Sequence, residues 1–241
     1  MIKLTPGERL HLARLALART RRRALSRAMR TRALRWLAGP GIADELLIVP
    51  PDLRTPDPSL FEELAAGQLG LGGAIVDLNG HSPFALLPPS PAWARELNGF
   101  GWLRDLRAAN SDAAYAMARR LVAEWVQRNA LTFPRTDPHA VIARRIISWI
   151  SHASLILEGV SPRAYEATTD SLGQQIQFLA TSWRDAPAGH ERLLTLTALV
   201  LADLCVAGHD RQLRRMQRLF GDELNRQILP DGGHISRNPR N

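Results

Sequence analysis

Two of the seven histidines stand in sequence contexts that could serve chemistry. His190 follows Pro187-Ala188-Gly189 at a predicted helix start, where backbone N–H groups can hold an anion and a neutral imidazole is favoured. His234 follows Asp231-Gly232-Gly233, a tight turn that can aim its ring into a cleft. An imidazole in such a place can accept or donate a proton near neutral pH. Because an ordinary solvated loop histidine also fits each context, the residue types alone leave the function open.

Motifs for other common chemistries are absent from the sequence. It contains no P-loop, GxGxxG, HExxH or CxxC pattern, so nucleotide binding, zinc-protease activity and thiol redox chemistry have no support. The single cysteine, Cys205, excludes a disulfide framework and a cysteine-based zinc cluster. We therefore expect no metal site and no cofactor.

The net charge of +8 is concentrated near the N-terminus. Residues 1–37 contain ten arginines and Lys3 against one acidic residue, Glu8, which gives +10 and leaves −2 for the remainder. Leucines between the arginines predict a basic helical arm over residues 1–38. Such an arm either packs on the body through its leucines or contacts an anionic membrane surface or another polyanion. Since the remainder is acidic and carries no recognition motif, no specific nucleic-acid binding is expected.

Residues 98–241 predict an all-α domain of successive helices. Start signals occur at Ser111-Asp112, Asp137-Pro138, Ser161-Pro162, Gly189-His190 and Asp210. The segment from about 191 to 206 is apolar nearly all round, which predicts a buried helix. This spacing predicts antiparallel helices with short loops, arranged as a solenoid or as an incomplete α/α toroid.

Individual side chains on these helices have expected positions as well. Trp125, Trp149 and Trp183 fall on apolar stripes and are expected in the core. One helix is expected to begin at Pro138 and to carry its apolar stripe as far as Leu157, with His152 on its solvent-facing side.

Residues 39–97 differ from both neighbouring segments because they are rich in proline and glycine. Short β-like runs at 46–49 and 74–76, with a short helix over about 59–66, predict a linker with small strands packed on the helical body.

The sequence also bears on location. No apolar run reaches the length of a membrane span and no secretory signal is visible, so the cytoplasm is the default compartment. The chain stops seven residues after His234 without a closing element, which predicts that it is the first part of a longer protein.

Three stretches carry a family resemblance. Residues 227–239 run Gln-Ile-Leu-Pro-Asp-Gly-Gly-His-Ile-Ser-Arg-Asn-Pro, residues 98–106 run Asn-Gly-Phe-Gly-Trp-Leu-Arg-Asp-Leu, and residues 189–194 run Gly-His-Glu-Arg-Leu-Leu. They resemble the Asp-Gly-Gly-His, Phe-x-Trp-Leu-x-x-Leu and Asn-His-Leu-Leu segments of heparinase II/III-like polysaccharide lyases. The resemblance spans about residues 40–241. It implies an α/α toroid, followed in full-length members by a β-sandwich that is absent here, and β-elimination on uronic-acid-containing glycans.

β-Elimination removes the proton at C5 beside a carboxylate and expels the O4-linked sugar. It needs a group that neutralises the carboxylate, a base, and an acid for the leaving oxygen. The resemblance implies that His190 and His234 are catalytic and that Trp102, Arg104 and Arg237 bind substrate, with Trp102 stacking on a sugar ring. It also implies an acidic polysaccharide as partner, and a periplasmic or envelope location as the alternative to the cytoplasm.

The chain departs from the family pattern at three positions. Gly189 stands where the family has a carboxylate-neutralising Asn, Ser236 where it often has Glu, and Asn241 where its catalytic Tyr falls. The two tyrosines, Tyr115 and Tyr165, lie inside predicted helical stripes. The isolated chain is therefore expected to be a weak or inactive lyase. The alternative is a non-catalytic helical module that binds anionic glycan, the cell envelope or a membrane surface.

Overall fold

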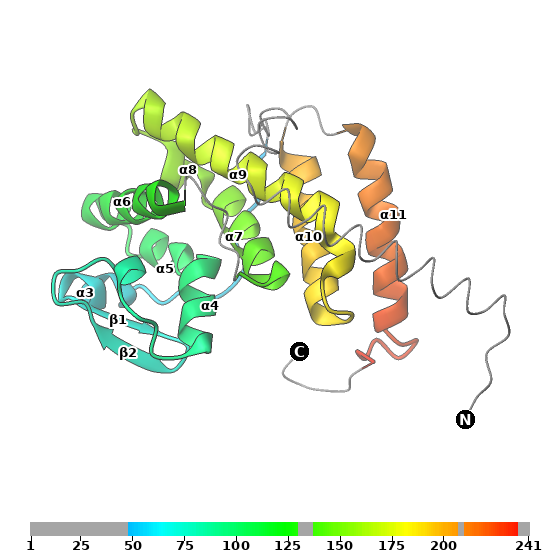
Figure 1. Ribbon diagram of the computed structural model, residues 1–241, viewed down its shortest axis with the longest axis horizontal. Helices are drawn as coiled ribbons and strands as arrows, with labels where there is room; N and C mark the ends of the chain where they lie inside the picture. The colour runs from blue at the N-terminus through cyan, green and yellow to red at the C-terminus, as the bar shows by residue number, and fades with distance from the viewer. Residues whose placement is uncertain (1–47, 130–136, 207–209, 236–241) are drawn as a thin grey trace, which may run out of the picture.

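The computed structural model describes residues 48–129, 137–206 and 210–235. In these residues the chain is mostly α-helical with one two-stranded antiparallel sheet (Figure 1), which confirms the coarse prediction of an all-α fold with a small strand-containing segment. The predicted arm over residues 1–38 and Arg237 lie outside the described residues.

The elements follow the predicted order closely. They are α3 (Leu60–Ala65), β1 (Gln68–Leu71), β2 (Ala74–Asp77), η1 (Pro83–Ala85), α4 (Pro91–Gly99), α5 (Leu103–Ala108), α6 (Asp112–Asn129), α7 (His139–Ser151), α8 (Ala153–Leu157), α9 (Pro162–Ser182), η2 (Trp183–Asp185), α10 (His190–Cys205) and α11 (Asp210–Gln227). The five predicted helix starts and the strand at 74–76 are confirmed. Residues 48 and 49, the described part of the other predicted strand, are not in a strand.

Serine and proline determine where two of the helices begin. Ser161 accepts a hydrogen bond from a backbone N–H of the first turn of α9, and Pro162 occupies the first helical position. Ser90 and Pro91 do the same for α4. A serine side chain satisfies one N–H that a helix start leaves unpaired, and proline has no N–H to leave unpaired. These are local rules, which is why the boundaries follow from the sequence.

The hairpin of β1 and β2 docks on α4 through its turn. Gly72 and Gly73 form this turn with φ angles of 56° and 78°, a left-handed conformation that glycine adopts at no steric cost. A Cβ at Gly72 would lie 2.7 Å from the backbone nitrogen of Trp93, so a larger residue cannot approach α4 this closely. The Gly72 N–H also donates to the Glu96 carboxylate over 2.7 Å. The turn therefore positions the hairpin against α4.

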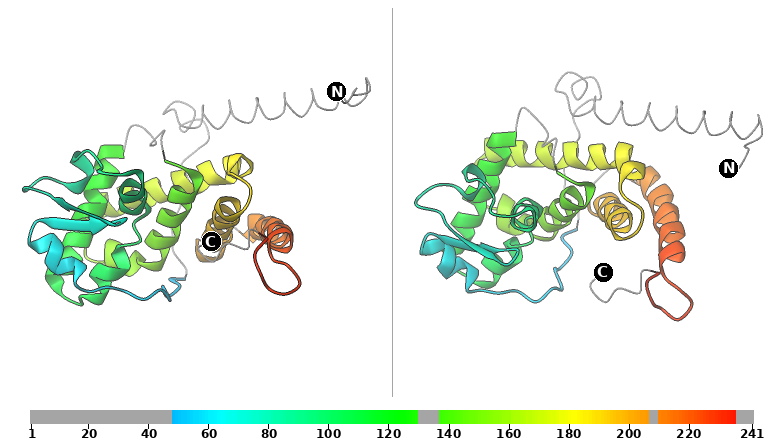
Figure 2. Two further views of the ribbon diagram at one scale, coloured as in Figure 1. Left: turned by 90° about the horizontal axis from the view of Figure 1, so that it is seen from below. Right: turned by 60° about the horizontal axis from the view of Figure 1, so that its bottom comes forward.

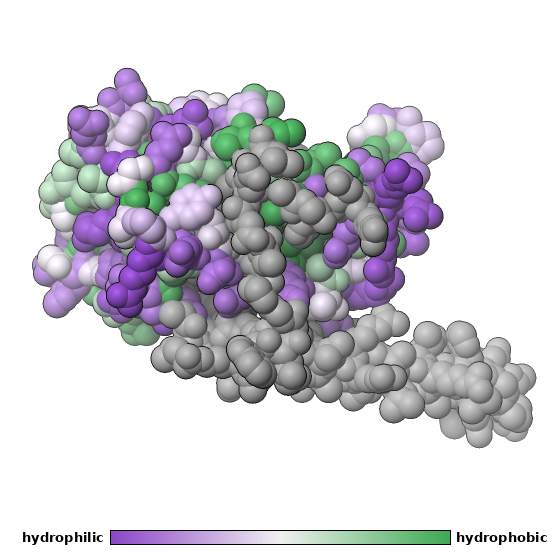
Figure 3. Space-filling view, turned by 90° about the horizontal axis from the view of Figure 1, so that it is seen from above, coloured by the Kyte–Doolittle hydropathy of each residue, from purple (hydrophilic) through white to green (hydrophobic). Residues whose placement is uncertain are grey.

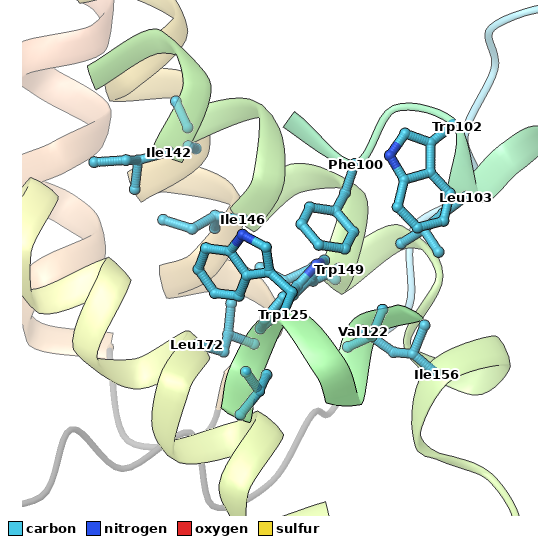
Figure 4. Close-up of a cluster of buried hydrophobic side chains, with 14 of the residues drawn as sticks. Phe100, Trp102, Leu103, Val122, Trp125, Ile142, Ile146, Trp149, Ile156 and Leu172 are labelled. Carbon is cyan, nitrogen blue, oxygen red and sulfur yellow. The ribbon is translucent and has the colours of Figure 1, made fainter. Parts of the chain in front are cut away.

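An aromatic cluster lies at the centre of the core (Figure 4). The centroid of the Phe100 ring is 5.0 Å from Trp102, 5.7 Å from Trp125 and 5.4 Å from Trp149. The contacts with Trp125 and Trp149 are edge-to-face, an arrangement that the ring quadrupoles favour. The predicted burial of Trp125, Trp149 and Trp183 is confirmed.

Helix α7 lies at the centre of the helical array. It packs against α4, α9 and α10, and α10 packs in turn against α11. The α10 and α11 helices lie side by side and run in opposite directions (Figures 1 and 2). Because α7 has several neighbours, most of its residues are buried, Arg145 and Ser148 among them, whereas Arg144 is exposed.

The structure corrects the prediction of one helix from Pro138 to Leu157. The chain leaves helical geometry at His152, where φ is −119° and ψ is 26°, and this residue separates α7 from the short α8. His152 is 1% exposed and therefore buried rather than solvent-facing. Asp52, from the segment before α3, lies 4.0 Å from its ring and helps to cover it. No local sequence pattern can predict a contact between residues this far apart in the chain.

The described part of the predicted linker packs on the helical body. Leu64, Leu69 and Trp93 belong to the same hydrophobic cluster as Trp149 and Leu199. Helix α4 runs without interruption across the predicted boundary at residue 97. Helix α4 and Leu71 of the hairpin supply one wall of a cleft in the helical body.

Candidate anion-binding cleft

A cleft opens where α4, α5, α7 and α10 meet. Its volume is about 530 Å³, within the range of typical ligand sites. Four arginines line it, which we call the arginine cluster: Arg54, Arg95, Arg104 and Arg144. The other lining residues are His190, Leu71, Glu96, Gly99, Gly101, Trp102, Asp105, Ile147 and Leu194. The cleft therefore combines four guanidinium groups with the carboxylates of Glu96 and Asp105 and with apolar residues such as Leu71 and Leu194.

Two arginines of the cluster have no partner within the described part of the chain. Arg95 on α4 and Arg144 on α7 are exposed and make no hydrogen bond or ion pair there. Arg54 differs, because Asp52 accepts from its Nε at 2.9 Å and from its Nη2 at 2.6 Å. Nε of Arg104 lies 3.4 Å from the Asp105 carboxylate. An anion can therefore pair with the guanidinium groups of Arg95 and Arg144 without breaking an existing hydrogen bond or ion pair.

Arginine side chains lie within van der Waals distance of Gly99 and Gly101. A Cβ at Gly99 would lie 3.6 Å from Cβ of Arg144. A Cβ at Gly101 would lie 3.7 Å from Nη1 of Arg104 and 3.8 Å from Nη1 of Arg54. Two guanidinium groups from separate chain segments therefore approach the same point above Gly101.

The backbone between these glycines is strained at Phe100. This residue ends α4 with φ at 57°, a left-handed conformation that costs a non-glycine residue about 1–3 kcal/mol. Its ring is fully buried in the aromatic cluster, and this packing holds the conformation in place. Strain of this kind is concentrated at functional sites. Here it shapes the turn from α4 to α5 that carries Gly99 and Gly101.

The carboxylates around the cleft differ in their electrostatics. Hydrogen bonds from Arg54 lower the pKa of Asp52 to about 2. Burial raises the pKa of Asp105, although the Asp57 N–H at 2.9 Å and the nearby Arg104 act in the opposite direction. Asp52 in turn raises the pKa of Arg54. The fork between Asp52 and Arg54 is therefore a fixed ion pair at the edge of the cleft.

His190 is the first residue of α10 and lines the same cleft. The preceding Gly189 has φ of 99° and ψ of −146°, a combination that glycine alone adopts readily. An asparagine at position 189, as in the family that the sequence resembles, would be strained there. The start of a 16-residue helix also contributes partial positive charge. His190 is thus an exposed imidazole beside a cluster of fixed cations.

The structure brings together three of the five predicted site residues. Trp102, Arg104 and His190 line the cleft, whereas Arg237 lies outside the described residues. Trp102 is 4% exposed, and its indole N–H donates to the carbonyl of Leu97 over 3.0 Å. Its ring is buried in the aromatic cluster, so it offers the cleft no open face for stacking.

His234 has a different setting at the same end of the α10–α11 pair. Its Nε2 lies 2.9 Å from Oε1 of Gln227, and because an amide oxygen only accepts, the proton is on Nε2. Nε2 of Gln227 donates to the Gly189 carbonyl over 2.9 Å and to Glu223 over 2.7 Å. His234 is not one of the described residues that line the cleft. It supports the start of α10 through Gln227.

Sequence reasoning missed three members of the arginine cluster. Arg54, Arg95 and Arg144 are isolated in the sequence and come from three different segments. Arg144 is exposed on α7, and nothing local distinguishes it from other surface arginines. The packing of α4 on α7 brings Arg95 and Arg144 to one cleft, and the segment before α3 adds Arg54.

The described cleft supplies no phenol. Tyr115 donates to the side chain of Asn110 over 2.9 Å, and Tyr165 is exposed on α9; neither lines the cleft. The described ranges also contain no group of three or more His, Cys, Asp or Glu residues that could hold a metal ion. What the cleft offers is cationic binding and one imidazole.

The described surface shows a mixed character. On the face seen in Figure 3, hydrophilic and hydrophobic residues are interspersed. Among residues 48–129, 137–206 and 210–235, no helix combines the length and the apolar character needed to cross a bilayer.

Comparison with known proteins gives one informative similarity. No family model and no solved structure matches the chain. It is similar to FtsZ-localized protein C of Caulobacter vibrioides (strain NA1000 / CB15N), with 25% identity over 194 residues. The match covers 79% of this chain and 33% of that protein, so the chain spans about one third of the length of this relative.

Proposed function

We propose that this chain binds uronic-acid-containing glycans in the arginine-lined cleft, as the carbohydrate-binding part of a heparinase II/III-like polysaccharide lyase. The observation that carries the proposal is the convergence of four guanidinium groups and His190 on one cleft of about 530 Å³. Uronic acids present a carboxylate on a sugar ring, and a guanidinium group matches a carboxylate with two parallel hydrogen bonds.

The unpaired arginines explain how the carboxylate is held. Arg95 and Arg144 have no partner to give up within the described chain, so pairing them with a carboxylate breaks no existing hydrogen bond. Leu71 and Leu194 supply apolar contact for the sugar ring. In this arrangement an arginine neutralises the substrate carboxylate. In the family that the sequence resembles, an Asn has this role at the position where this chain has Gly189.

His190 is the candidate base. A neutral imidazole beside the neutralised carboxylate can take the C5 proton; the electron pair forms the C4–C5 double bond and the C4–O4 bond breaks. The leaving oxygen then needs a proton, and the described cleft offers no phenol to supply it. For this reason we expect binding with turnover near background.

We also propose that the helical array is part of an α/α toroid. The antiparallel α10 and α11 pair and the central position of α7 support this arrangement. A solution-scattering profile of the protein tests it, because a curved toroidal array and an open solenoid differ in their distance distributions.

Binding is tested by calorimetric titration with an octasaccharide of galacturonic acid. Arg144→Gln is expected to weaken binding about three- to tenfold, since it removes one charged contact. The matched control is Arg120→Gln on α6, an exposed arginine outside the cleft, which is expected to bind as the unaltered chain does. Equal affinity of the Arg144→Gln and Arg120→Gln variants contradicts the proposal.

Catalysis is tested separately by the ultraviolet absorbance of the unsaturated uronate product on a panel of acidic glycans. We expect a rate near background, and His190→Ala should remove what remains. Robust turnover that survives His190→Ala contradicts the role of His190 while leaving glycan binding intact.

A second candidate function comes from the relative. The name of FtsZ-localized protein C ties the location of that protein to FtsZ, and the match covers 79% of this chain. We therefore propose an FtsZ-dependent location as the alternative. Co-sedimentation with purified FtsZ tests it, with Arg144→Gln as a comparison; recovery of this chain only in the supernatant contradicts it.

A further inference from the structure

A second basic cavity adjoins the arginine-lined cleft. It has a volume of about 330 Å³ and lies between the segment before α3 and helix α5. Its charged lining residues are Asp52, Arg54, Arg104 and Arg107, and the ring of His152 also lines it. Arg107 is exposed, and the described structure gives its guanidinium group one long contact, 3.4 Å to the carbonyl of Ser151.

The two cavities share a wall. Arg54 and Arg104 line both of them, and their Nη1 atoms approach the same point above Gly101. Arg95 and Arg144 lie on one side of this pair and Arg107 on the other. The guanidinium groups therefore form a continuous series across the surface rather than two separate sites.

The negative charge in the second cavity is already compensated. Arg54 holds the Asp52 carboxylate with a two-point contact. His152 is buried, and its Nδ1 donates to the Ser148 carbonyl over 2.9 Å, which orients Nε2 toward Asp52. Arg104 and Arg107 remain to attract an anion.

We propose that the two cavities form one groove that binds an extended acidic glycan with charged groups on successive sugar units, one in the larger cleft and the next beside Arg107. The inference rests on the proposed glycan-binding function and adds a second subsite and a preference for longer chains. A ligand that bridges Arg54 and Arg104 contacts both cavities, so each added acidic unit gains a charged contact.

The lining favours a glycan over a single-stranded nucleic acid. Binding of single strands relies on aromatic faces on which bases stack. Within the described part of the chain, the only aromatic ring lining the second cavity is that of the buried His152, and Trp102 in the first cavity is 4% exposed. A lining of charged groups without open aromatic faces therefore disfavours a single strand, whereas guanidinium groups can hold an acidic glycan through its carboxylates.

The test compares two ligand lengths, a disaccharide and an octasaccharide of galacturonic acid, by calorimetric titration. Arg107→Gln is expected to weaken octasaccharide binding about fivefold and to leave disaccharide binding unchanged. Arg144→Gln is expected to weaken both, Arg107→Lys to restore most of the octasaccharide affinity, and Arg120→Gln to change neither. Thermal unfolding of each variant confirms that it is folded.

Each other outcome overturns a defined part of the argument. Equal effects of Arg107→Gln on the two lengths, or no effect on the octasaccharide, contradict the second subsite while glycan binding stands. Binding of neither length contradicts the proposed function and the inference together. A single-stranded oligonucleotide of equal charge that binds as tightly as the octasaccharide, with the same dependence on Arg107, contradicts the assignment to glycans.

Discussion

The side-chain amide of Gln227 donates to the backbone carbonyl of Gly189 over 2.9 Å and so joins the end of α11 to the start of α10. The same glutamine accepts from His234, and the turn beyond it closes through a hydrogen bond from Ile235 N–H to the Gln227 carbonyl. Residues that are 38 positions apart in the sequence thus support the turn that places His190 in the cleft.

Truncation of this buried glutamine should cost stability. Gln227→Ala removes the hydrogen bonds to the Gly189 carbonyl and to Oε1 of Glu223, for a loss of about 1–3 kcal/mol in the free energy of unfolding. Urea denaturation measures it. Gln217→Ala, at an exposed position of the same helix, is the control and should change stability by less than about 0.5 kcal/mol. Similar losses for both variants contradict a specific role of the tether.

Two glycine-to-alanine substitutions should have opposite signs. Gly189→Ala places a side chain at φ of 99° and should destabilise the protein by about 1–3 kcal/mol. Gly221→Ala, inside α11 with open space around the added methyl group, should stabilise it by about 0.5–1 kcal/mol. Thermal unfolding of the two variants provides the comparison. A stabilised Gly189→Ala variant would show that the turn before α10 tolerates an ordinary residue.

Neighbouring arginines on α7 should separate stability from binding. Arg145 is fully buried and its guanidinium group donates to Gln175, to the Asn98 carbonyl and to Asp137, at 2.7, 2.7 and 2.9 Å. Arg145→Met leaves these acceptors unpaired, at a cost of about 3–5 kcal/mol. Arg144→Gln, one residue earlier and exposed, should shift stability by less than about 0.5 kcal/mol and weaken glycan binding. Chemical denaturation and titration of both variants check the contrast.

Stability should fall as the pH drops below about 7 because of His152. Burial lowers the pKa of this histidine below its ordinary value of 6.5, so the unfolded chain binds more protons in that range and the native state loses stability as pH falls through 6.5. Asp52, with its pKa at about 2, stays charged throughout. Urea midpoints at pH 7.5 and 5.5 measure the slope. His152→Gln should reduce this dependence of stability on pH, whereas His81→Gln, at an exposed position, should leave it unchanged. If His152→Gln leaves the dependence unchanged, His152 is not its cause.

Removal of residues 1–37 should weaken binding to anionic surfaces. The deletion removes eleven basic residues and one acidic residue, a net charge of +10, from a protein of net charge +8. Retention on a heparin column and on anionic vesicles should fall sharply, and its dependence on salt should become flatter. Arg144→Gln in the full chain is the comparison that isolates the cleft. Elution of the truncated protein at the same salt concentration as the full chain contradicts a role for the arm.

Features that depend on residues close together in the sequence were predictable. The helix starts at Ser161-Pro162 and near Ser111, and the burial of Trp125 and Trp149, follow from capping chemistry and helical periodicity, which act over one or two turns. The place of His190 at a helix start was predicted from the residues around it and is confirmed, whereas its role in a site was implied by the family resemblance and stays a prediction.

Features that depend on distant segments were decided by the tertiary structure. The break at His152 and the inward orientation of its ring depend on packing with Asp52, one hundred residues earlier. The arginine cluster depends on how α4, α5 and α7 pack, because its members carry no common local pattern. His234, similar to His190 in its glycine-rich context, has a different role because Gln227 holds its ring. The amino-acid sequence by itself therefore determined the helices and their capped ends, whereas only the packing of those helices determined which cations share a cleft, since electrostatic contacts form between side chains that the fold brings within a few ångströms.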